Sequence, residues 1–214
     1  IYVAKRETEL TDSEIEDIKD LTKKEKWREE TGAMGQTSAG EKKFLVQRTK
    51  DNTYIFDTKL DSLKKFCEEH IDTYVNEVIR PKNLELEFYI TQSWLSVVEP
   101  GYDFMSAHAH PNSLISGVFY VSTVEGDAIQ FYDINTAAKT IINIEPGTGK
   151  TNLWNVTQQN LNIENNVLLL FPSYLGHGVK QNVSKISDRI SIAFNVFVKG
   201  NIGEYHDSSK LNLR

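Results

Sequence analysis

Hydrophobic and polar residues change their spacing near residue 84, and the two spacings predict two kinds of structure. Before that point, apolar residues recur every three or four positions, which is the period of an amphipathic helix. Residues 10–21 begin with a capping box, in which Thr11 is the N-cap and Glu14 follows three positions later. Residues 56–79 contain one apolar stripe that ends before Pro81, and it consists of Leu60, Leu63, Cys67, Ile71, Tyr74 and Val78. We therefore expect two helices before the spacing changes.

Beyond residue 84 the apolar residues form short runs rich in Val, Ile, Phe and Tyr. Gly, Asn, Asp or Pro separate these runs at intervals of roughly ten residues, which is typical of short antiparallel strands. The expected strands lie within residues 84–101, 114–124, 127–133, 140–145, 165–173 and 188–200. The pattern predicts a mainly β fold, a sandwich or barrel with the helices packed outside it.

The chain is expected to form a single domain, because its 214 residues suit one large domain and contain no internal repeat. We expect a helical part over residues 1–83, a β core over 84–199 and a tail over 200–214. Residues 31–43 are rich in Gly, Ser and Thr, which predicts an exposed, mobile loop. That loop is either a linker or a lid that orders over a substrate.

Charge and cysteine content narrow the cellular setting. The net charge of −6 disfavours broad electrostatic binding to nucleic acid or to an anionic membrane. No apolar run approaches the roughly 18 residues that a membrane span needs. Cys67 is the one cysteine, so neither an intrachain disulfide nor a thiolate zinc site can form. We expect a cytoplasmic protein, in the host cytoplasm if a phage encodes it.

Two of the five histidines, His108 and His110, lie one residue apart in the stretch HAHPNS. Residues i and i+2 of a strand point to the same side, so both imidazoles could reach one metal ion. The candidate third ligand is His177, which follows an apolar strand in the stretch LLLFPSYLGHGV. Such a set occupies one face of the metal and leaves three positions open, as in non-haem Fe(II) oxygenases.

A candidate anion-binding arginine follows the last of these histidines. Arg189 comes twelve residues after His177 (189 − 177), and Ser191 lies on the same face of the expected strand. A buried arginine is costly unless an anion pairs with it. Its planar guanidinium suits a carboxylate, and the serine hydroxyl adds a donor. Alternatively, Arg189 simply pairs with Asp188 or with solvent at the strand end.

Taken in order, the segments HAHPNSLISGVFYV, GDAIQFYD, LLLFPSYLGHGV and DRISIAFN resemble the 2-oxoglutarate- and Fe(II)-dependent oxygenases. More narrowly, they resemble uncharacterised members from marine bacteria and their phages. The resemblance spans about residues 86–199 and implies a double-stranded β-helix, also called a jelly roll or cupin-like fold. It further implies an enzyme that couples oxidative decarboxylation of 2-oxoglutarate by O2 to C–H oxidation, as a hydroxylase does. Such a reaction needs no general base, so no catalytic residue is expected beyond the metal ligands.

The same resemblance implies roles for individual residues. His108 and His177 match the Fe(II) ligands of the family. Arg189 matches the residue that binds the distal carboxylate of 2-oxoglutarate, with Ser191 as its partner. Tyr120 falls where some relatives place a tyrosine that also touches the cosubstrate.

One position departs from the family pattern, because His110 stands where the family has a carboxylate ligand. Three neutral imidazoles leave a divalent ion with its full charge, so the identity of the metal stays open. We expect His108, His110 and His177 to bind the metal together. Three alternatives remain: Asn112 or a water replaces His110 as ligand, His108 faces the substrate instead, or Asp103 supplies the missing carboxylate.

Two rival functions also remain. A three-histidine cupin-type dioxygenase that uses no 2-oxoglutarate would explain His110 better, but it would give Arg189 no role. A non-catalytic jelly-roll binding protein would need no metal at all. The substrate is expected to be a small molecule or a peptide, and a homodimer is conceivable through the long helix or an edge strand. The residues expected to line the cavity are Trp94, Asn112, Ser113 and Asn195.

Overall fold

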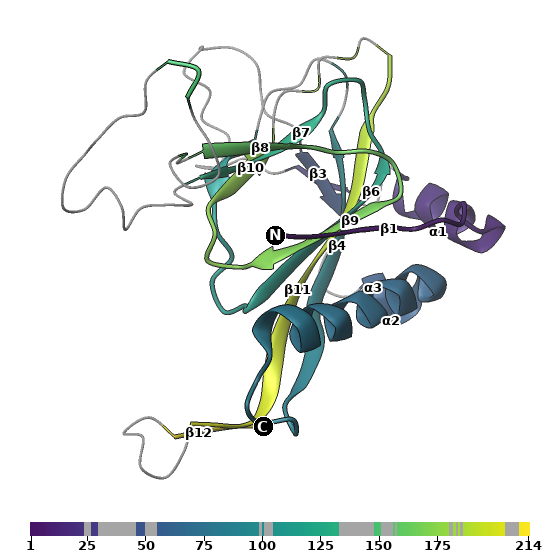
Figure 1. Cartoon of the computed structure of the whole chain (residues 1–214). Helices are drawn as coiled ribbons and strands as arrows, with labels where there is room; N and C mark the ends of the chain where they lie inside the picture. The colour runs from purple at the N-terminus through teal and green to yellow at the C-terminus, as the bar shows by residue number, and fades with distance from the viewer. Residues whose placement is uncertain are drawn as a thin grey trace.

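The fold consists of two antiparallel β-sheets, with helices against the outer side of the larger sheet (Figure 1). It is seen in a computed structural model. The residues that the structure describes are 1–23, 27–29, 46–49, 55–98, 100, 105–132, 148–150, 156, 158–179, 182, 184, 186–203 and 210–214. The expected strand at 140–145, the expected loop at 31–43 and Asp103 lie outside these residues.

The larger sheet provides the frame of the molecule. Its strand order is β1-β9-β6-β11-β4-β3-β2, and β12 pairs with the far end of β11. The strands, in sheet order, are β1 (Tyr2–Lys5), β9 (Val167–Pro172), β6 (Ile115–Ser122), β11 (Arg189–Ile202), β4 (Glu87–Val98), β3 (Val46–Thr49), β2 (Trp27–Glu29) and β12 (Leu211–Leu213).

The smaller sheet has the order β5-β10-β7-β8. Its strands are β5 (Met105–His108), β10 (His177–Val179), β7 (Ala128–Tyr132) and β8 (Gln158–Asn162). The two sheets and the helices outside them confirm the mainly β, jelly-roll-like fold that the spacing of apolar residues predicts.

Alternation along the strands of the larger sheet produces two apolar layers. On β6, Phe119 packs into the layer that includes Leu63, Cys67 and other helix residues. Its neighbours Val118 and Tyr120 belong to a second layer, shared with side chains such as Phe131 of β7. Successive side chains of a strand point to opposite faces, so one strand serves both layers. The second layer forms the floor of the cavity described below.

The helices agree with the sequence pattern except at two points: the expected second helix is divided before Asp61, where Leu60 has a φ of 63, and its regular stripe ends early. α1 (Asp12–Leu21) has the predicted capping box between Thr11 and Glu14, and α2 (Ile55–Thr58) and α3 (Asp61–Tyr74) follow. The stripe was expected to continue to Val78, but α3 passes into a π-helical turn at Val75–Ile79. The wider turn shifts the helical phase, so Val75 is buried while Val78 is 55% exposed.

The helical interpretation of residues 1–83 is wrong in part. β1 pairs along its length with β9, and β2 and β3 extend the same sheet beyond β4. These strands have three or four residues each, which is too short for an alternating pattern to be distinctive. Within the part of the chain that the structure describes, no helix combines the length and the apolar character needed to cross a membrane.

Candidate metal centre

Three histidines meet at one end of the cavity between the sheets. His108 is the last residue of β5 and His177 is the first residue of β10, and the two are paired in register. His110 lies two residues beyond β5, where its backbone N–H donates to the carbonyl of Ser173 at 2.9 Å. The expectation that both early histidines lie on a strand is therefore correct only for His108. Each imidazole offers a ring nitrogen, and these nitrogens all lie within 4.8 Å of one another.

The separations suit ligands on one face of a metal ion. The Nε2 atoms of His110 and His177 are 3.2 Å apart. Two nitrogens that each lie about 2.1 Å from an ion, at right angles to each other, are about 3 Å apart. The His108 and His177 rings are also close, with centroids separated by 4.5 Å. The ring nitrogens of the three histidines therefore lie close enough together that they could hold one metal ion.

The surroundings of His177 keep its ligand nitrogen available. Its Nδ1 lies 3.0 Å from the carbonyl oxygen of Leu175, so this nitrogen carries the proton and donates, while Nε2 keeps its lone pair. Burial lowers the pKa of His177 to about 4, opposed by the Leu175 carbonyl and reinforced by His108. The imidazole is therefore neutral near pH 7, which is the form that binds a metal.

A polar network lies behind His110. The side-chain amide nitrogen of Asn195 lies 3.5 Å from Nδ1 of His110 and donates to Gln92 at 3.1 Å. The amide oxygen accepts from Ser116 at 3.0 Å, and Ser116 is in turn 2.9 Å from Ser173. The network therefore lies against Nδ1 of His110, the ring nitrogen that does not face His177.

The same cavity reaches Arg189, Ser191 and Tyr120 on the larger sheet. β11 begins at Arg189, and an irregularity in its pairing with β6 between Ile190 and Ser191 places Ser191 opposite Tyr120. Bulges of this kind redirect side chains near active sites. The Arg189 side chain is only 3% exposed, and it donates from Nη1 to Oδ1 of Asp127 at 2.8 Å. Removing one partner of such a buried pair typically costs about 3–5 kcal/mol.

The Tyr120 hydroxyl identifies a polar position that a ligand can fill. Among the described residues, it is the buried side-chain polar atom without a hydrogen-bond partner. Burial raises its pKa, Arg189 lowers it and Asp127 raises it, so the hydroxyl stays protonated and able to donate. Buried polar groups are normally satisfied, which indicates that a bound group completes this end of the cavity. The imidazole nitrogens fit a metal ion, and the donors of Tyr120 and Arg189 fit a carboxylate.

The remaining predicted residues are placed as follows. Trp94 lines the cavity and packs against His110, with ring centroids 5.8 Å apart. Asn195 contacts His110 from behind, and Ser113 bonds to Ser173 at 2.7 Å within the same network, but neither is among the described residues that line the cavity. Asn112 is exposed at a turn with φ 58, so the expectation that it lines the cavity is wrong.

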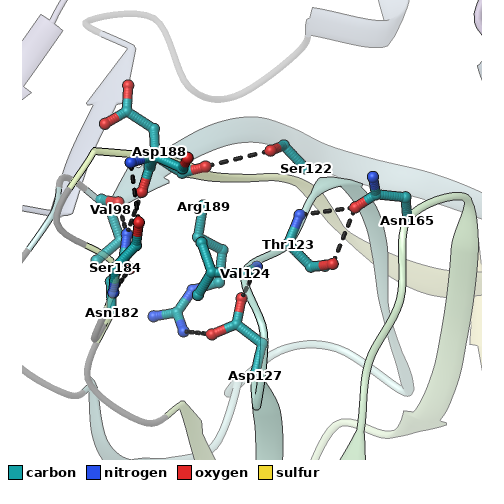
Figure 2. A network of polar contacts seen from close by, with 11 residues as sticks. Val98, Ser122, Thr123, Val124, Asp127, Asn165, Asn182, Ser184, Asp188 and Arg189 are labelled. Atoms are coloured by element: carbon teal, nitrogen blue, oxygen red, sulfur yellow. Dashed lines mark hydrogen bonds and ion pairs between the residues drawn. The ribbon is translucent and has the colours of Figure 1, made fainter.

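Sequence reasoning missed the partner of Arg189. Figure 2 shows the guanidinium directed toward Asp127, while the carboxylate of the neighbouring Asp188 points away from it. Asp127 follows Gly126 at the start of a strand, where an aspartate is easily taken for an ordinary turn residue. Ser116, Ser173 and Gln92 of the Asn195 network were missed as well, because each is unremarkable in its own segment.

Residues 92–195 match the model of a protein family described as "Putative 2OG-Fe(II) oxygenase", where 2OG is 2-oxoglutarate. This segment, just under half of the chain, is therefore identified as a 2OG-Fe(II) oxygenase segment. The matched segment contains the three histidines, Arg189 and Ser191. This oxygenase family uses Fe(II), 2-oxoglutarate and O2, as the resemblance of the sequence implies. Family membership favours this function over a three-histidine cupin and over a non-catalytic jelly roll.

Solved structures support the fold of this oxygenase. A non-heme α-ketoglutarate-dependent carbocyclase from nogalamycin biosynthesis matches with a TM-score of 0.58 and 11% identity over 93% of this chain and 80% of that one. A Trichoplax adhaerens prolyl hydroxylase, in complex with a hypoxia-inducible factor peptide, matches with a TM-score of 0.54 and 13% identity over 86% and 76%. The chain spans little more than half, 56%, of a Burkholderia pseudomallei oxidoreductase of the 2OG-Fe(II) oxygenase family, which it matches over 60% of its own length at 12% identity; the TM-score of 0.38 is too low to bear on the fold. A search of curated proteins gives no match.

Proposed function

We propose that this oxygenase holds Fe(II) with His108, His110 and His177, and holds the distal carboxylate of 2-oxoglutarate with Arg189, Ser191 and Tyr120. The reaction that we propose is hydroxylation of a C–H bond, which makes the enzyme a dioxygenase. The observation that supports this most strongly is one cavity that contains both the three ring nitrogens and the guanidinium.

The histidine end supports a metal through neutral ligands. His177 keeps an unprotonated Nε2 because its other nitrogen faces a backbone carbonyl. His110 presents Nε2 to the same point while Nδ1 faces Asn195. These contacts fix the orientation of two imidazoles before metal binds, which reduces the cost of assembling the centre.

The arginine end supports a carboxylate through fixed donors. Arg189 and Ser191 are two residues apart on β11, and Tyr120 is the register partner of Ser191 on β6. Their side chains line the same cavity from neighbouring strands. A planar guanidinium and two hydroxyls can together surround a carboxylate, since all three donate hydrogen bonds.

The bound iron and 2-oxoglutarate supply the oxidising chemistry, and the chain supplies orientation and shielding. Trp94, Phe171 and Val179 form apolar walls of the cavity. Such walls exclude water from the reacting groups and strengthen the electrostatic interactions between them. No proton transfer by a side chain is required of these residues.

Anaerobic absorbance spectroscopy tests the proposal. The Fe(II)-loaded protein should give a weak visible charge-transfer band when 2-oxoglutarate is added. The band should disappear in His177→Ala, which cannot hold the metal, and in Arg189→Ala, which cannot hold the distal carboxylate. A matched control is His70→Ala, because His70 bonds to Tyr2 at 2.7 Å outside this cavity.

The possible outcomes separate the rival functions. Iron binding without a band would favour the cupin-type dioxygenase, and the absence of iron binding would favour a non-catalytic protein. Retention of the band in Arg189→Ala would contradict the role given to that residue.

The wider setting is also part of the proposal. We propose a small-molecule or peptide substrate and no nucleic-acid partner, because the net charge is −6. A cytoplasmic location agrees with the single cysteine, Cys67, which is fully buried and forms no disulfide. A homodimer and an origin in a marine bacterium or phage stay predictions.

A further inference from the structure

Asp127 lies behind the arginine end of the cavity and is among the most deeply buried acidic residues described, at 3% exposure. It directly precedes β7 and follows Gly126, whose φ of +81 shapes the turn from β6. The Asp127 side chain is 1% exposed and its Oδ1 accepts from Nη1 of Arg189 at 2.8 Å. A carboxylate taken this far out of water needs such a partner.

The Asp127 carboxylate cannot move freely within its turn. Its Oδ2 accepts from the backbone N–H of Val124 at 2.9 Å. Its own backbone N–H donates to the carbonyl of Val124 at 3.0 Å, and its carbonyl accepts from Ile163 at 3.1 Å. Both carboxylate oxygens and both backbone groups therefore have partners, so the position offered to Arg189 is defined by the backbone of Val124, after β6, and of Ile163, just after β8.

The surrounding segments are braced as well (Figure 2). Thr123 donates from its backbone N–H and its hydroxyl to Asn165 at 2.7 and 2.9 Å, which ties the β6–β7 turn to the residues before β9. On the other flank, the buried Asn182 donates to Val98 and Ser187 at 2.8 and 2.9 Å. These contacts hold both ends of the Arg189–Asp127 pair.

We propose that Asp127 is a positioning residue for the cosubstrate: it holds Nη1 of Arg189 so that the guanidinium meets the distal carboxylate of 2-oxoglutarate in one orientation. This rests on the proposed binding of 2-oxoglutarate at Arg189. A guanidinium recognises a carboxylate through a planar fork of donors, so the direction of the fork decides the fit.

The pair also sets the charge of the cavity. The charges of Arg189 and Asp127 cancel, so this end recognises a carboxylate by donor geometry instead of net positive charge. Three neutral imidazoles leave a divalent metal with its full charge at the other end. Counting only Asp127 and the described residues that line the cavity, the metal-loaded site then carries two positive charges, which match the two negative charges of a 2-oxo dicarboxylate.

A comparison of two compounds that chelate iron distinguishes positioning of the Arg189 guanidinium by Asp127 from a general effect of Asp127 on the charge of the cavity. 2-Oxoglutarate and pyruvate can both chelate iron through a 2-oxo acid, but pyruvate has no distal carboxylate. Changes in cavity charge alter the binding of both compounds, whereas a misdirected guanidinium alters only 2-oxoglutarate. Anaerobic titration calorimetry of the Fe(II)-loaded full chain gives both dissociation constants without turnover.

In Asp127→Asn, one of the two carboxylate contacts is lost, because an amide nitrogen must face either Arg189 or the Val124 N–H. We expect the ratio of the 2-oxoglutarate to the pyruvate dissociation constant to rise about tenfold or more, as for other outer partners of a ligand-binding group. The matched control is Asp188→Asn, whose side chain is exposed and directed away. For Asp188→Asn, the ratio of the two dissociation constants should stay within about twofold of wild type, as expected of a surface substitution.

A milder variant covers the case in which Asp127→Asn does not fold. Asn165 is exposed, and Asn165→Ala removes only the tie to Thr123, so the ratio should rise about threefold, as expected from the loss of one ordinary hydrogen bond that steadies the turn. An unchanged ratio in a folded Asp127→Asn, or in Asn165→Ala if the first variant is unfolded, would overturn the positioning role and leave a purely structural ion pair. If wild type binds no 2-oxoglutarate, the proposed function itself fails instead.

Discussion

The two ends of the cavity are held in place by different means. The histidine end is built mainly on β5 and β10, which have four and three residues, and its ligands are uncharged. The arginine end begins the 14-residue strand β11, and it depends on a buried ion pair. At the first end, hydrogen bonds to backbone and amide groups orient the side chains, whereas at the second a long strand and a fixed counter-charge do so. Substitutions at one end should therefore leave binding at the other largely intact.

The largest effect is expected at the most buried ligand. His177→Ala removes an imidazole that is already oriented by Leu175, and we expect the Fe(II) dissociation constant to rise by more than about a hundredfold. Anaerobic equilibrium dialysis measures this constant directly. His70→Ala serves as the control, and near-normal iron binding by His177→Ala would show that the cluster is not the metal site.

The next effect tests the length of the ligand at position 110. His110 reaches the cluster with its distal nitrogen, Nε2. A glutamate carboxylate reaches about as far, whereas an aspartate carboxylate is one bond shorter. His110→Glu should keep the Fe(II) dissociation constant within about tenfold of wild type, while His110→Asp should lose more than that. Equal affinities of the two variants, measured by the same dialysis, would contradict a direct role for residue 110.

A smaller effect is expected behind the ligands. Asn195→Ala removes the amide that faces Nδ1 of His110, and we expect iron affinity to fall about tenfold, as is usual for outer partners of metal-bound histidine. Binding of pyruvate to the iron-loaded variant should change little. The control is Asn160→Ala, since Asn160 is an exposed amide that bonds to Gln130. A loss of 2-oxoglutarate binding with unchanged iron affinity would contradict this role and assign Asn195 to the arginine end of the cavity.

The smallest effect belongs to the hydroxyl beside Arg189. Ser191→Ala removes one neutral donor, whose contribution of about 1 kcal/mol corresponds to roughly a fivefold weaker 2-oxoglutarate complex. Iron binding should remain as in wild type. Calorimetric titration of both ligands checks the result. A weaker metal complex with unchanged 2-oxoglutarate binding would reverse the assignment of the two ends.

The sequence predicted the components of the site better than the contacts that hold them. Alternation and turn residues predicted β4, β6, β7, β9 and β11, whereas the short strands β5 and β10 that carry His108 and His177 were not predicted. The order of His108, His177 and Arg189 along the chain nevertheless indicated the chemistry. The Arg189–Asp127 pair joins residues 62 positions apart, and no local pattern specifies such a partner. The π-helical turn at Val75–Ile79 was missed because it interrupts a regular stripe without a proline or glycine.

The central claim is that three imidazoles bind the metal, and X-ray absorption of the anaerobic Fe(II) protein tests it most directly by counting histidine ligands. We expect three imidazoles in wild type and two in His110→Glu, with an oxygen ligand in place of the third. Two imidazoles in wild type, unchanged in the variant, would contradict it and remove His110 from the metal centre.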